Sequence, residues 1–304
     1  MPSGWFTGPR FLNRQINSSG LMTTYNINPD IDNYCVMGNP VSHSKSPLIH
    51  SEFAKQTGQE IYYQAIEVDI DGFARAVNEF RTDGGMGLNV TVPFKEEACR
   101  ISDKLTPRAN HAGAVNTVWF EQNNTICFGD NTDGIGLIRD LTINNDIDLA
   151  GLDILVLGAG GAVRGILGPL LNESPSRVVI ANRTLARAQT LVELFSTHGD
   201  ISAVEFSSLP GQSFDLVING TSLGLKGEIP PLPEGLLKDQ ASCYDLAYAK
   251  GDTAFVSWAL QQGAGKAVDG IGMLVEQAAE SFYIWRGVMP KTAPVISLLK
   301  MKMA

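Results

Sequence analysis

The sequence predicts an α/β protein of two domains, both built on mainly parallel sheets. Three observations carry this prediction. Short apolar runs typical of buried strands alternate with stretches of helical spacing along most of the chain. A glycine-rich turn, Gly158–Ala162, interrupts one such run and leads directly into a helical pattern. The length of 304 residues is sufficient for two separate cores.

The composition excludes several classes of protein. Hydrophobic residues make up 44% and charged residues 18% of the chain, as in ordinary soluble globular proteins. The formal net charge is −9 and no basic block offsets it, so we expect no nucleic-acid or anionic-membrane partner. No apolar run approaches the ~20 residues of a membrane span, and none forms the apolar region of a signal peptide. We therefore expect a cytoplasmic protein that binds a small molecule.

The cysteines and histidines indicate neither disulfides nor a metal site. Cys35, Cys99, Cys127 and Cys243 are scattered without C-x-x-C spacing, which is typical of thiols in a reducing compartment. The four histidines form no H-x-x-x-H pair, so we predict no bound metal.

The N-terminal part of the chain has no clear structural pattern. Residues 1–32 are rich in Ser, Asn, Gly and Thr and lack apolar periodicity, which predicts a disordered extension. The sequence leaves open whether Met22 is the working start. Regular structure is expected to begin with a strand at Tyr34–Met37.

The segment after this strand carries two serines with different expected roles. Gly38-Asn39-Pro40 closes the strand, and a helical pattern runs over Leu48–Thr57. Pro47 suits the first turn of that helix and Ser46 suits its N-cap. Ser44 lies further out and has no such structural need, so a ligand role fits it better.

The following elements bring polar side chains to one edge of a sheet. Strand, helix and strand patterns follow in turn over Tyr62–Val68, Gly72–Arg81 and Gly87–Val92. Asn89 and Thr91 share one face of the last strand, near the carboxyl edge where α/β proteins bind ligands. Lys95 opens the next helix. A solvated charge beside two glutamates is the ordinary interpretation of this lysine, and catalysis is the alternative.

A second polar cluster follows in the sequence. Gly113–Val118 predicts a strand, which includes Asn116. A further strand at Ile126 runs into Asp130-Asn131-Thr132-Asp133-Gly134, and a helix is expected over Ile135–Leu141. The cluster could serve only as a helix cap. Two acids and an amide between an apolar strand and a helix nevertheless indicate a site.

The glycine turn belongs to a unit typical of dinucleotide binding. A strand over Asp153–Leu157, a helix over Val163–Leu171 and a strand over Val178–Ala181 form a βαβ pattern of about thirty residues. Glycines let the backbone approach a pyrophosphate, and the N–H groups at the helix start favour its negative charge. The match to G-x-G-x-x-G is imperfect, because Val163 stands at the third glycine position.

The end of the second strand indicates which dinucleotide binds. An NAD site usually has Asp or Glu there, for the ribose 2′-OH. Here the strand ends in Asn182-Arg183-Thr184, with Arg187 one helical turn later. Two guanidinium groups suit a 2′-phosphate, so we predict NADP(H). The alternative is a solvated arginine pair that opens a helix.

The last third of the chain continues the alternation and ends in an apolar helix. A helix, a strand, a polar loop and a late strand are expected over Leu185–His198, Phe214–Ile218, Asn219–Gly224 and Ser242–Leu246. The tail begins at the glycines Gly270 and Gly272 and carries Gln277 among residues typical of a core. A buried amide needs partners, so Gln277 either satisfies backbone groups or reaches a ligand.

Taken together, these motifs resemble the shikimate dehydrogenase family. The matching blocks occur in the family's order from about Tyr34 to the C-terminus. They are Gly38-Asn39-Pro40, His43-Ser44-Lys45-Ser46-Pro47, Asn89-Val90-Thr91-Val92-Pro93-Phe94-Lys95, Gly113-Ala114-Val115-Asn116-Thr117, Asp130-Asn131-Thr132-Asp133-Gly134, the glycine turn, Asn182-Arg183-Thr184, and Gly272-Met273-Leu274-Val275 with Gln277.

The resemblance implies reversible NADPH-dependent reduction of 3-dehydroshikimate to shikimate, in the route to chorismate and the aromatic amino acids. It places Lys95 and Asp133 as the catalytic acid/base pair. The substrate-binding positions that it implies are Ser44, Ser46, Asn89, Thr91, Asn116, Tyr248 and Gln277. The cofactor-binding positions are Gly158, Ala159, Gly160, Gly161, Ala162, Asn182, Arg183, Thr184, Arg187, Leu246 and Gly270.

The resemblance also implies how the domains are divided. A substrate-binding α/β domain would comprise residues 33–132 and 270–304, and a Rossmann-type NADP-binding domain residues 133–269. The chain would then return to the first domain near Gly270 and Gly272, which supply backbone freedom. Pro107 is a departure, at a place where some relatives carry an acidic cofactor contact.

The chemistry agrees with the residue types. Hydride reduction of a ketone leaves an alkoxide that needs a proton, and a lysine oriented by an aspartate can supply one. Two other functions stay open: a dinucleotide-binding regulator without catalysis, and a methylene dehydrogenase of folate type, which would leave the polyol-suited serines unexplained. Activity on quinate or with NAD, and the choice between monomer and homodimer, are also open.

Overall fold

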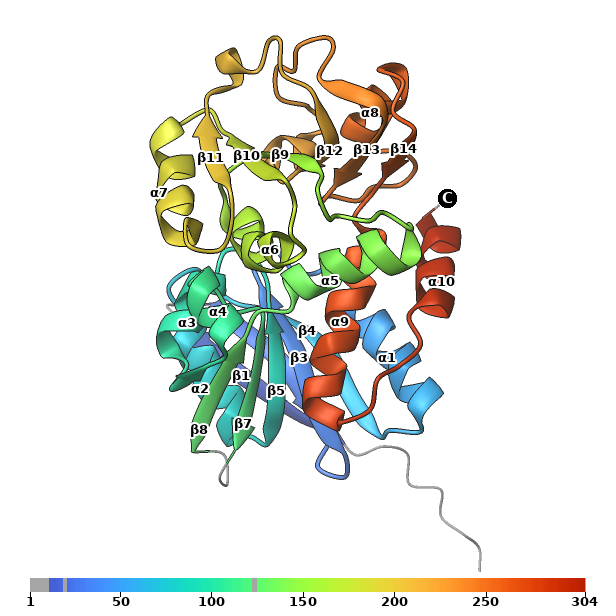
Figure 1. Ribbon diagram of the computed structural model, residues 1–304. Coiled ribbons are helices and arrows are strands. Elements are labelled where there is room, and N and C mark those ends of the chain that lie inside the picture. The colour runs from blue at the N-terminus through green and yellow to red at the C-terminus, as the bar shows by residue number, and fades with distance from the viewer. Residues whose placement is uncertain (1–10, 19–20, 122–124, 304) are drawn as a thin grey trace, which may run out of the picture. The chain divides into compact units, whose positions relative to one another are not determined.

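The computed structural model describes residues 11–18, 21–121 and 125–303, which form two compact units (Figure 1). Unit 1 comprises the chain up to Asn110, together with Ala114–Asn131 and Ser281–Lys291. Unit 2 comprises His111–Gly113, Thr132–Glu280 and the chain from Thr292 onward. The units divide the tail differently from the prediction. The change of unit after Glu280 falls inside helix α9 (Ile271–Arg286) rather than at Gly270–Gly272.

Unit 1 contains a six-stranded sheet of mixed direction. Its strands lie in the order β4 (Ile61–Glu67), β3 (Asp32–Gly38), β5 (Gly85–Val90), β7 (Thr117–Glu121), β8 (Ile126–Asp130), β6 (Lys104–Leu105). β3 pairs in parallel with β4 and β5, and β6 pairs in parallel with β8. β7 runs antiparallel to its neighbours β5 and β8. The sheet is therefore mainly parallel, as the sequence predicts.

Four helices of the first part of the chain are α1 (Ser46–Thr57), α2 (Phe73–Thr82), α3 (Lys95–Ile101) and α4 (Pro107–Ala112). The helix α2 shows why this region folds. Phe73, Ala76, Val77 and Phe80 recur at helical spacing and are all buried, so they form one apolar face. The Phe73 ring stacks on Phe94 with centroids 4.8 Å apart. Burial of each such ring contributes about 1.5–3 kcal/mol.

The N-terminal segment corrects one expectation. Residues 12–18 and 21–27 form an antiparallel hairpin, β1 (Leu12–Ser18) with β2 (Leu21–Ile27), instead of a disordered extension. Tyr25 and Ile27 alternate along β2 and are buried in the core of unit 1. The Gln64 side chain accepts from the N–H of Asn26 and donates to its carbonyl, which attaches the hairpin to β4. Tyr25 and Ile27 are the two apolar anchors of the hairpin. Two such residues among polar neighbours are too few to give a recognisable apolar periodicity in the sequence.

Unit 2 contains a six-stranded sheet in which every pair of strands is parallel (Figure 1). The order is β11 (Ile201–Val204), β10 (Arg177–Ala181), β9 (Asp153–Leu157), β12 (Phe214–Asn219), β13 (Leu237–Asp245), β14 (Lys266–Val268). In chain order this is 3-2-1-4-5-6, the arrangement of dinucleotide-binding sheets. The strand order reverses between β9 and β12. Ligands of open α/β sheets bind at such a point.

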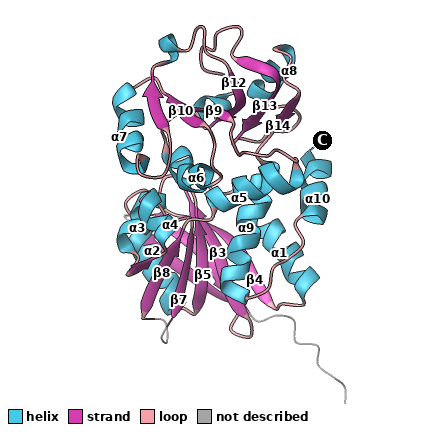
Figure 2. Ribbon diagram, in the orientation of Figure 1, coloured by secondary structure: helices cyan, strands magenta, loops and turns pink. Residues whose placement is uncertain are grey.

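Helices cover both faces of this sheet (Figure 2). The helical segments of unit 2 besides α9 are α5 (Asp133–Arg139), a π-helical turn (Asp140–Asn144), α6 (Gly161–Asn172), α7 (Leu185–Phe195), α8 (Ala254–Gln261) and α10 (Ala293–Met303), with 3₁₀ turns at Phe206–Ser208 and Ser222–Lys226. Successive residues of β9 point to opposite faces of the sheet and pack into two different hydrophobic cores. Ile154 and Val156 pack with α6 and α7, whereas Leu155 and Leu157 pack with α8. This alternation explains why β9 is apolar from Ile154 onward.

Several element boundaries differ from the predicted ones. α6 begins at Gly161 instead of Val163, and α5 begins at Asp133 instead of Ile135. β7 begins at Thr117, so Asn116 precedes the strand. No helix in the described part of the chain combines the length and apolar composition that crossing a bilayer requires.

Candidate active site

The two serines lie at the start of α1 in unit 1, and neither is at its N-cap position. α1 begins at Ser46 itself, preceded by Lys45, and no side chain caps it in the N-cap position. The hydroxyl of Ser44 accepts a hydrogen bond from the Ser46 N–H at 3.3 Å. The expectation that Ser46 is the N-cap is therefore wrong, and Ser44 has a structural bond that the sequence did not reveal.

The segment Thr91–Lys95 turns from β5 into α3. The N–H of Thr91 donates to the Met37 carbonyl at 3.0 Å, and the Phe94 N–H donates to the Thr91 carbonyl at 3.0 Å. A Cβ at Gly38 would collide with the Thr91 methyl group, so this glycine allows β3 and the turn to approach. Lys95, half-buried, is the first residue of α3.

Lys95 and Asn116 are brought together through the backbone. The Val115 N–H donates to the Lys95 carbonyl at 2.8 Å. Asn116 is buried, and its main chain bridges β5 and β8, because its carbonyl accepts from Val90 and its N–H donates to Asp130. Its carbonyl also accepts from the side chain of Asn89 at 3.1 Å. Unit 1 thus assembles predicted substrate and catalytic positions from separate parts of the chain.

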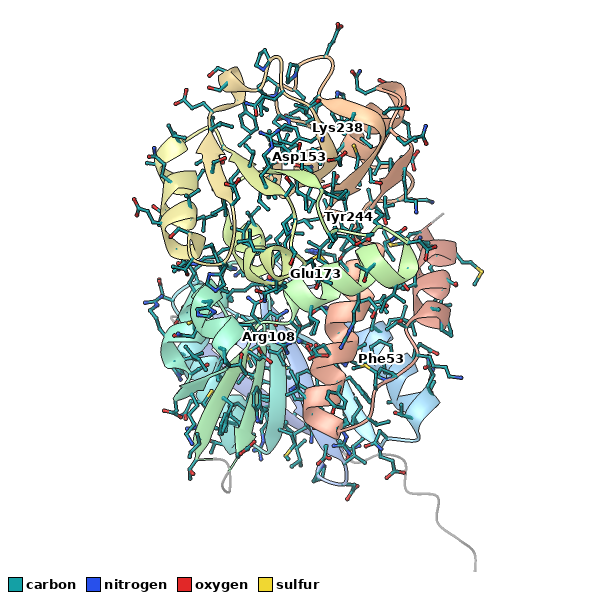
Figure 3. The ribbon with its side chains drawn as sticks, viewed as in Figure 1. Phe53, Arg108, Asp153, Glu173, Lys238 and Tyr244 are labelled. Carbon is teal, nitrogen blue, oxygen red and sulfur yellow. The ribbon has the colours of Figure 1, made fainter. Side chains whose placement is uncertain are left out.

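The Asp130 cluster is divided between the two units. Asp130 is buried in unit 1, where its carboxylate pairs with Arg108 (Figure 3) at 2.6 Å. Asp133 is buried in unit 2, as the first residue of α5. A negative charge is favourable at a helix N-terminus. Because Lys95 and Asp133 belong to different units, their pairing stays a prediction.

Gln277 lies against the start of α5 within unit 2. The hydroxyl of Thr132, the residue before Asp133, donates to the Gln277 side-chain oxygen at 3.4 Å. The amide nitrogen of Gln277 donates to the Leu274 carbonyl at 2.8 Å. A Cβ at Gly136 would lie 2.7 Å from the Gln277 backbone nitrogen, so the two helices pass closely there. Gln277 and Thr132 are 145 positions apart in the sequence, and the fold brings Gln277 to the start of α5.

The start of α9 is held by a buried acid that the sequence did not single out. The Tyr244 hydroxyl (Figure 3) donates to Asp140 at 2.5 Å, and the Asn144 side chain donates to the same carboxylate at 2.9 Å. A Cβ at Gly272 would collide with this carboxylate, so only glycine fits there. Burial raises the pKa of the Tyr244 hydroxyl, which keeps it a donor.

The predicted cofactor turn has the geometry of a dinucleotide site. Gly158 has φ = +101°, a conformation that favours glycine, and its Cβ would lie 3.0 Å from the Gly220 carbonyl. At Gly160 and Gly161 an added Cβ would meet no atom within 4 Å. The backbone is therefore accessible at the start of the twelve-residue helix α6, whose first N–H groups lack intrahelical partners.

The residues after β10 leave room for a phosphate. The side chains of Arg183, Thr184 and Arg187 are exposed, and the Asn182 side chain donates to the Thr184 carbonyl at 2.9 Å. The first turn of α7 contains no acidic residue. The glycine turn and these arginines therefore fit a dinucleotide with a 2′-phosphate.

Leu246, Tyr248 and Gly270 follow strand ends on the same sheet. The Leu246 N–H donates to the Asn219 carbonyl at 2.9 Å, and the Gly270 N–H donates to the Ala247 carbonyl at 3.0 Å. Tyr248 is half-buried, and burial raises the pKa of its hydroxyl. The polar loop and the late strand predicted from sequence thus meet at the carboxyl edge of β12 and β13.

A buried acid organises this loop and was missed by sequence reasoning. Asp245 accepts hydrogen bonds from the Asn219 side chain at 3.0 Å, the Ala247 N–H at 3.1 Å and the Thr253 hydroxyl at 2.6 Å. Burial raises the pKa of Asp245, against the effect of these bonds. Its position at the end of an apolar strand was the available signal.

Two hollows of unit 2 lie apart from the predicted positions. One of about 490 Å³ is lined by residues such as Lys266, Asp269 and Lys300, and one of about 200 Å³ by Asp140, Gly272 and Lys300 among others. Neither is lined by the residues predicted to bind substrate or cofactor. Within the described residues, no three His, Cys, Asp or Glu side chains are grouped to hold a metal ion.

Comparison with family models gives three matches along the chain. The substrate-binding domain of shikimate dehydrogenase matches residues 36–118, and shikimate / quinate 5-dehydrogenase matches residues 141–224. The C-terminal domain of shikimate 5′-dehydrogenase matches residues 270–300. Their order agrees with the order of the blocks in the sequence.

Individual relatives agree with these matches. The shikimate dehydrogenase (NADP(+)) of Alkalilimnicola ehrlichii is 59% identical over 269 residues, covering 88% of this chain and 98% of the relative. The crystal structure of the Ael1 enzyme of Pseudomonas putida is similar with a TM-score of 0.83 and 44% identity, covering 90% of this chain and all of that one. The shikimate 5-dehydrogenase of Thermus thermophilus, solved with NADP(H) and shikimate, has a TM-score of 0.79 and 32% identity, with 90% and 100% covered. The chain therefore belongs to the shikimate dehydrogenase family.

Proposed function

We propose that the protein catalyses the reversible NADPH-dependent reduction of 3-dehydroshikimate to shikimate, in the route to chorismate and aromatic amino acids. The 59% identity to a shikimate dehydrogenase (NADP(+)) is the observation that carries this proposal. The protein is thus an oxidoreductase acting on a CH–OH group. The alternatives of a non-catalytic regulator and a folate-type methylene dehydrogenase have no comparable support.

Lys95 and Asp133 are the proposed acid/base pair. NADPH, when bound, supplies the hydride that reduces the ketone carbon. The Lys95 ammonium gives its proton to the carbonyl oxygen as that oxygen becomes a hydroxyl, and accepts the proton in the reverse direction. The Asp133 carboxylate favours the charged ammonium and orients it. Each of the two residues opens a helix directly after a loop that leaves a strand, a rigid place for a reacting group.

The substrate is a small acid with several hydroxyl groups, and the proposed contacts are short polar side chains. We propose Ser44, Ser46, Asn89, Thr91, Asn116, Tyr248 and Gln277 as these contacts. Support comes from the hydrogen-bonded placement of Asn89 beside Asn116 in unit 1 and of Gln277 beside Thr132 in unit 2. Hydroxyl and amide groups suit a polyol because each can both donate and accept.

NADP(H) is the proposed cofactor, held by the turn Gly158–Ala162 and by residues at neighbouring strand ends. The positions are Gly158, Ala159, Gly160, Gly161, Ala162, Asn182, Arg183, Thr184, Arg187, Leu246 and Gly270. The turn binds the pyrophosphate at the start of α6, and the two arginines bind the 2′-phosphate. Support comes from the positive φ of Gly158 and the exposure of both arginines.

We also propose which domain binds which ligand and in which compartment the protein works. Residues 33–132 with part of the tail bind the substrate, and residues 133–269 bind NADP(H). The protein works in the cytoplasm, as the free cysteines Cys35, Cys99, Cys127 and Cys243 support. Its partners are small molecules, and it acts as a monomer or a homodimer.

The direct test is the absorbance of reduced nicotinamide during oxidation of a hydroxy acid. Shikimate and quinate are each combined with NADP⁺ and NAD⁺, and the four values of kcat/KM are compared. We expect the largest value for shikimate with NADP⁺. Absence of turnover with shikimate and either cofactor would overturn the proposed function.

A further inference from the structure

A fully buried histidine lies in unit 1 and has no part in the proposed chemistry. His50 on α1 is 0% exposed, and its Nε2 lies 3.1 Å from the side-chain oxygen of Asn89. Its other ring nitrogen, Nδ1, has no hydrogen-bond partner among the described residues. Because an amide oxygen only accepts, Nε2 carries the proton and donates to Asn89.

Aromatic rings surround this histidine. Its ring stacks on Tyr63 with centroids 4.2 Å apart and an angle of 7°, and the rings of Phe282 and Trp285 lie within 6.1 Å. Phe53 of α1 (Figure 3) meets it edge-on at 6.0 Å. Burial lowers the pKa of His50 to about 3, so the ring is neutral and its tautomer is constant near neutral pH.

The oxygen of Asn89 accepts from a second donor as well. The Tyr63 hydroxyl donates to it at 2.7 Å. On the opposite side, the Asn89 nitrogen donates to the Asn116 carbonyl at 3.1 Å and to the Ser281 hydroxyl at 3.0 Å. A backbone carbonyl can only accept, so the orientation of the Asn89 amide follows from its neighbours.

The hydrogen bonds continue in one direction toward Asn116. The Thr117 hydroxyl donates to the side-chain oxygen of Asn116 at 2.9 Å. The Asn89 nitrogen also donates to the Thr117 hydroxyl at 3.3 Å, and the hydroxyls of Thr117 and Ser281 lie 2.7 Å apart. The order of donation is therefore His50 and Tyr63 to Asn89, Asn89 to Thr117, and Thr117 to Asn116.

We propose that His50 and Tyr63 are positioning residues that hold the side chain of Asn116 in one orientation through Asn89 and Thr117. The carboxamide of Asn116 then directs its oxygen to Thr117, and its nitrogen is the end that donates to an oxygen of the substrate. This inference rests on the proposed function, because it assigns Asn116 to the substrate. In the opposite orientation the side-chain oxygen of Asn116 would face the substrate oxygen. Two hydrogen-bond acceptors would then meet, which weakens the contact.

The experiment removes the two hydrogen-bond donors to Asn89, singly and together, and keeps an aromatic ring at both positions. His50→Phe removes Nε2–H, and Tyr63→Phe removes only a hydroxyl. We expect each variant to raise the KM for shikimate by ~3–10-fold, with kcat and the KM for NADP⁺ within ~2-fold of the wild type. The double variant leaves the Asn89 oxygen without either donor, so its effect on the shikimate KM should exceed the product of the single effects.

Tyr62→Phe is the matched control, because Tyr62 neighbours Tyr63 on β4 and its ring lies against Phe11 instead. It should leave every kinetic constant unchanged. Unchanged shikimate KM in Tyr63→Phe and in the double variant, or an equal rise in the KM for NADP⁺, would overturn the inference alone. If His50→Phe does not fold, Tyr63→Phe is measured in the Ser46→Ala background as well, because the Tyr63 hydroxyl also hydrogen-bonds Ser46. The rise in the shikimate KM caused by Tyr63→Phe should persist there, and its disappearance would overturn the inference. Absence of shikimate turnover by the wild type would instead overturn the proposed function, and the inference with it.

Discussion

The side chain of Val163 occupies the space that Gly220 leaves open at the end of β12. A Cβ added at Gly220 would collide with a methyl group of Val163, and would lie 3.2 Å from the Leu246 side chain. Val163 stands at the third glycine position of the dinucleotide motif, where glycine normally permits close packing of helix and strand. In this protein the glycine that permits the close packing is Gly220, directly after the neighbouring strand β12.

We expect Gly220→Ala to lower the free energy of unfolding by ~1–3 kcal/mol, because the added methyl group overpacks this contact. Val163→Ala introduced together with it should recover part of the loss. Urea unfolding of the two single variants and the double variant measures the coupling. Gly168→Ala in α6 is the control, since its nearest contact would be an ordinary 3.4 Å. Additive effects of the two changes would show that the residues do not compete for space.

Lys95 is expected to affect turnover rather than binding. Lys95→Ala should lower kcat by ~10²–10⁴-fold with little change in the shikimate KM, because it removes the proposed proton donor. Steady-state kinetics with shikimate and NADP⁺ provide the measurement. Lys104→Ala, which removes an exposed lysine of unit 1, should leave kcat unchanged. Near-normal turnover by the Lys95 variant would rule out its role as acid/base.

Arg183 and Arg187 are expected to decide the choice of cofactor. Each should contribute on the order of 1.5–3 kcal/mol through charge-assisted bonds to the 2′-phosphate. Replacing both with glutamine should therefore raise the KM for NADP⁺ steeply and leave that for NAD⁺ nearly unchanged. The control replaces the exposed arginines Arg75 and Arg100, which makes the same change in net charge. Equal losses with both cofactors would show that Arg183 and Arg187 serve the fold.

Gln277 is expected to bind substrate and not cofactor. Gln277→Ala should weaken shikimate binding by ~1–3 kcal/mol, because a polar group of the substrate loses its partner, and should leave NADP⁺ affinity unchanged. Calorimetric titration of each ligand separates the two effects. The exposed Gln262 supplies the control variant, Gln262→Ala. Weaker NADP⁺ binding with unchanged shikimate binding would assign this part of α9 to the cofactor.

His50 makes stability depend on pH in a defined window. Its pKa of about 3 lies below the ordinary value near 6.5, so the unfolded chain binds more protons between these values. The free energy of unfolding should therefore fall as pH decreases from 6.5 toward 3. Between pH 7 and pH 5 the wild type should lose about 2 kcal/mol relative to His50→Phe. Urea unfolding at both pH values measures this, with His43→Asn as an exposed control. Parallel pH profiles of wild type and His50→Phe would contradict it.

The sequence predicts the Rossmann-type unit well because its signals are local. The strand Asp153–Leu157, the glycine turn and the strand near Val178 lie within about thirty residues, and the structure has β9, α6 and β10 there. The partner of Val163 was not predictable, because Gly220 is distant in the sequence and meets it only in the folded sheet. The same holds for His50, whose partner Asn89 is on another element.

The candidate site positions come from the sequence, whereas the buried groups around them became known only from the structure. The residue types in the eight ordered blocks indicated Lys95, Asn116 and Gln277, because each block is a short run of neighbouring residues that can be recognised without the fold. The buried groups of the surrounding structure, such as Ser281 beside Asn89 and Asp245 beside Asn219, look like ordinary core or strand-end residues until the contacts are known. The hairpin of residues 12–18 and 21–27 was missed because its two anchors, Tyr25 and Ile27, are outnumbered by polar neighbours.

The hairpin has a consequence for how the protein behaves at high concentration. β4 is the terminal strand of the unit 1 sheet, and a terminal strand presents backbone donors and acceptors to any other extended chain. The hairpin lies beside this strand, where the Gln64 side chain binds both backbone groups of Asn26. Self-association by edge-to-edge strand addition is thereby opposed on this side of the sheet, and a shortened chain without residues 12–27 would lose that protection against aggregation.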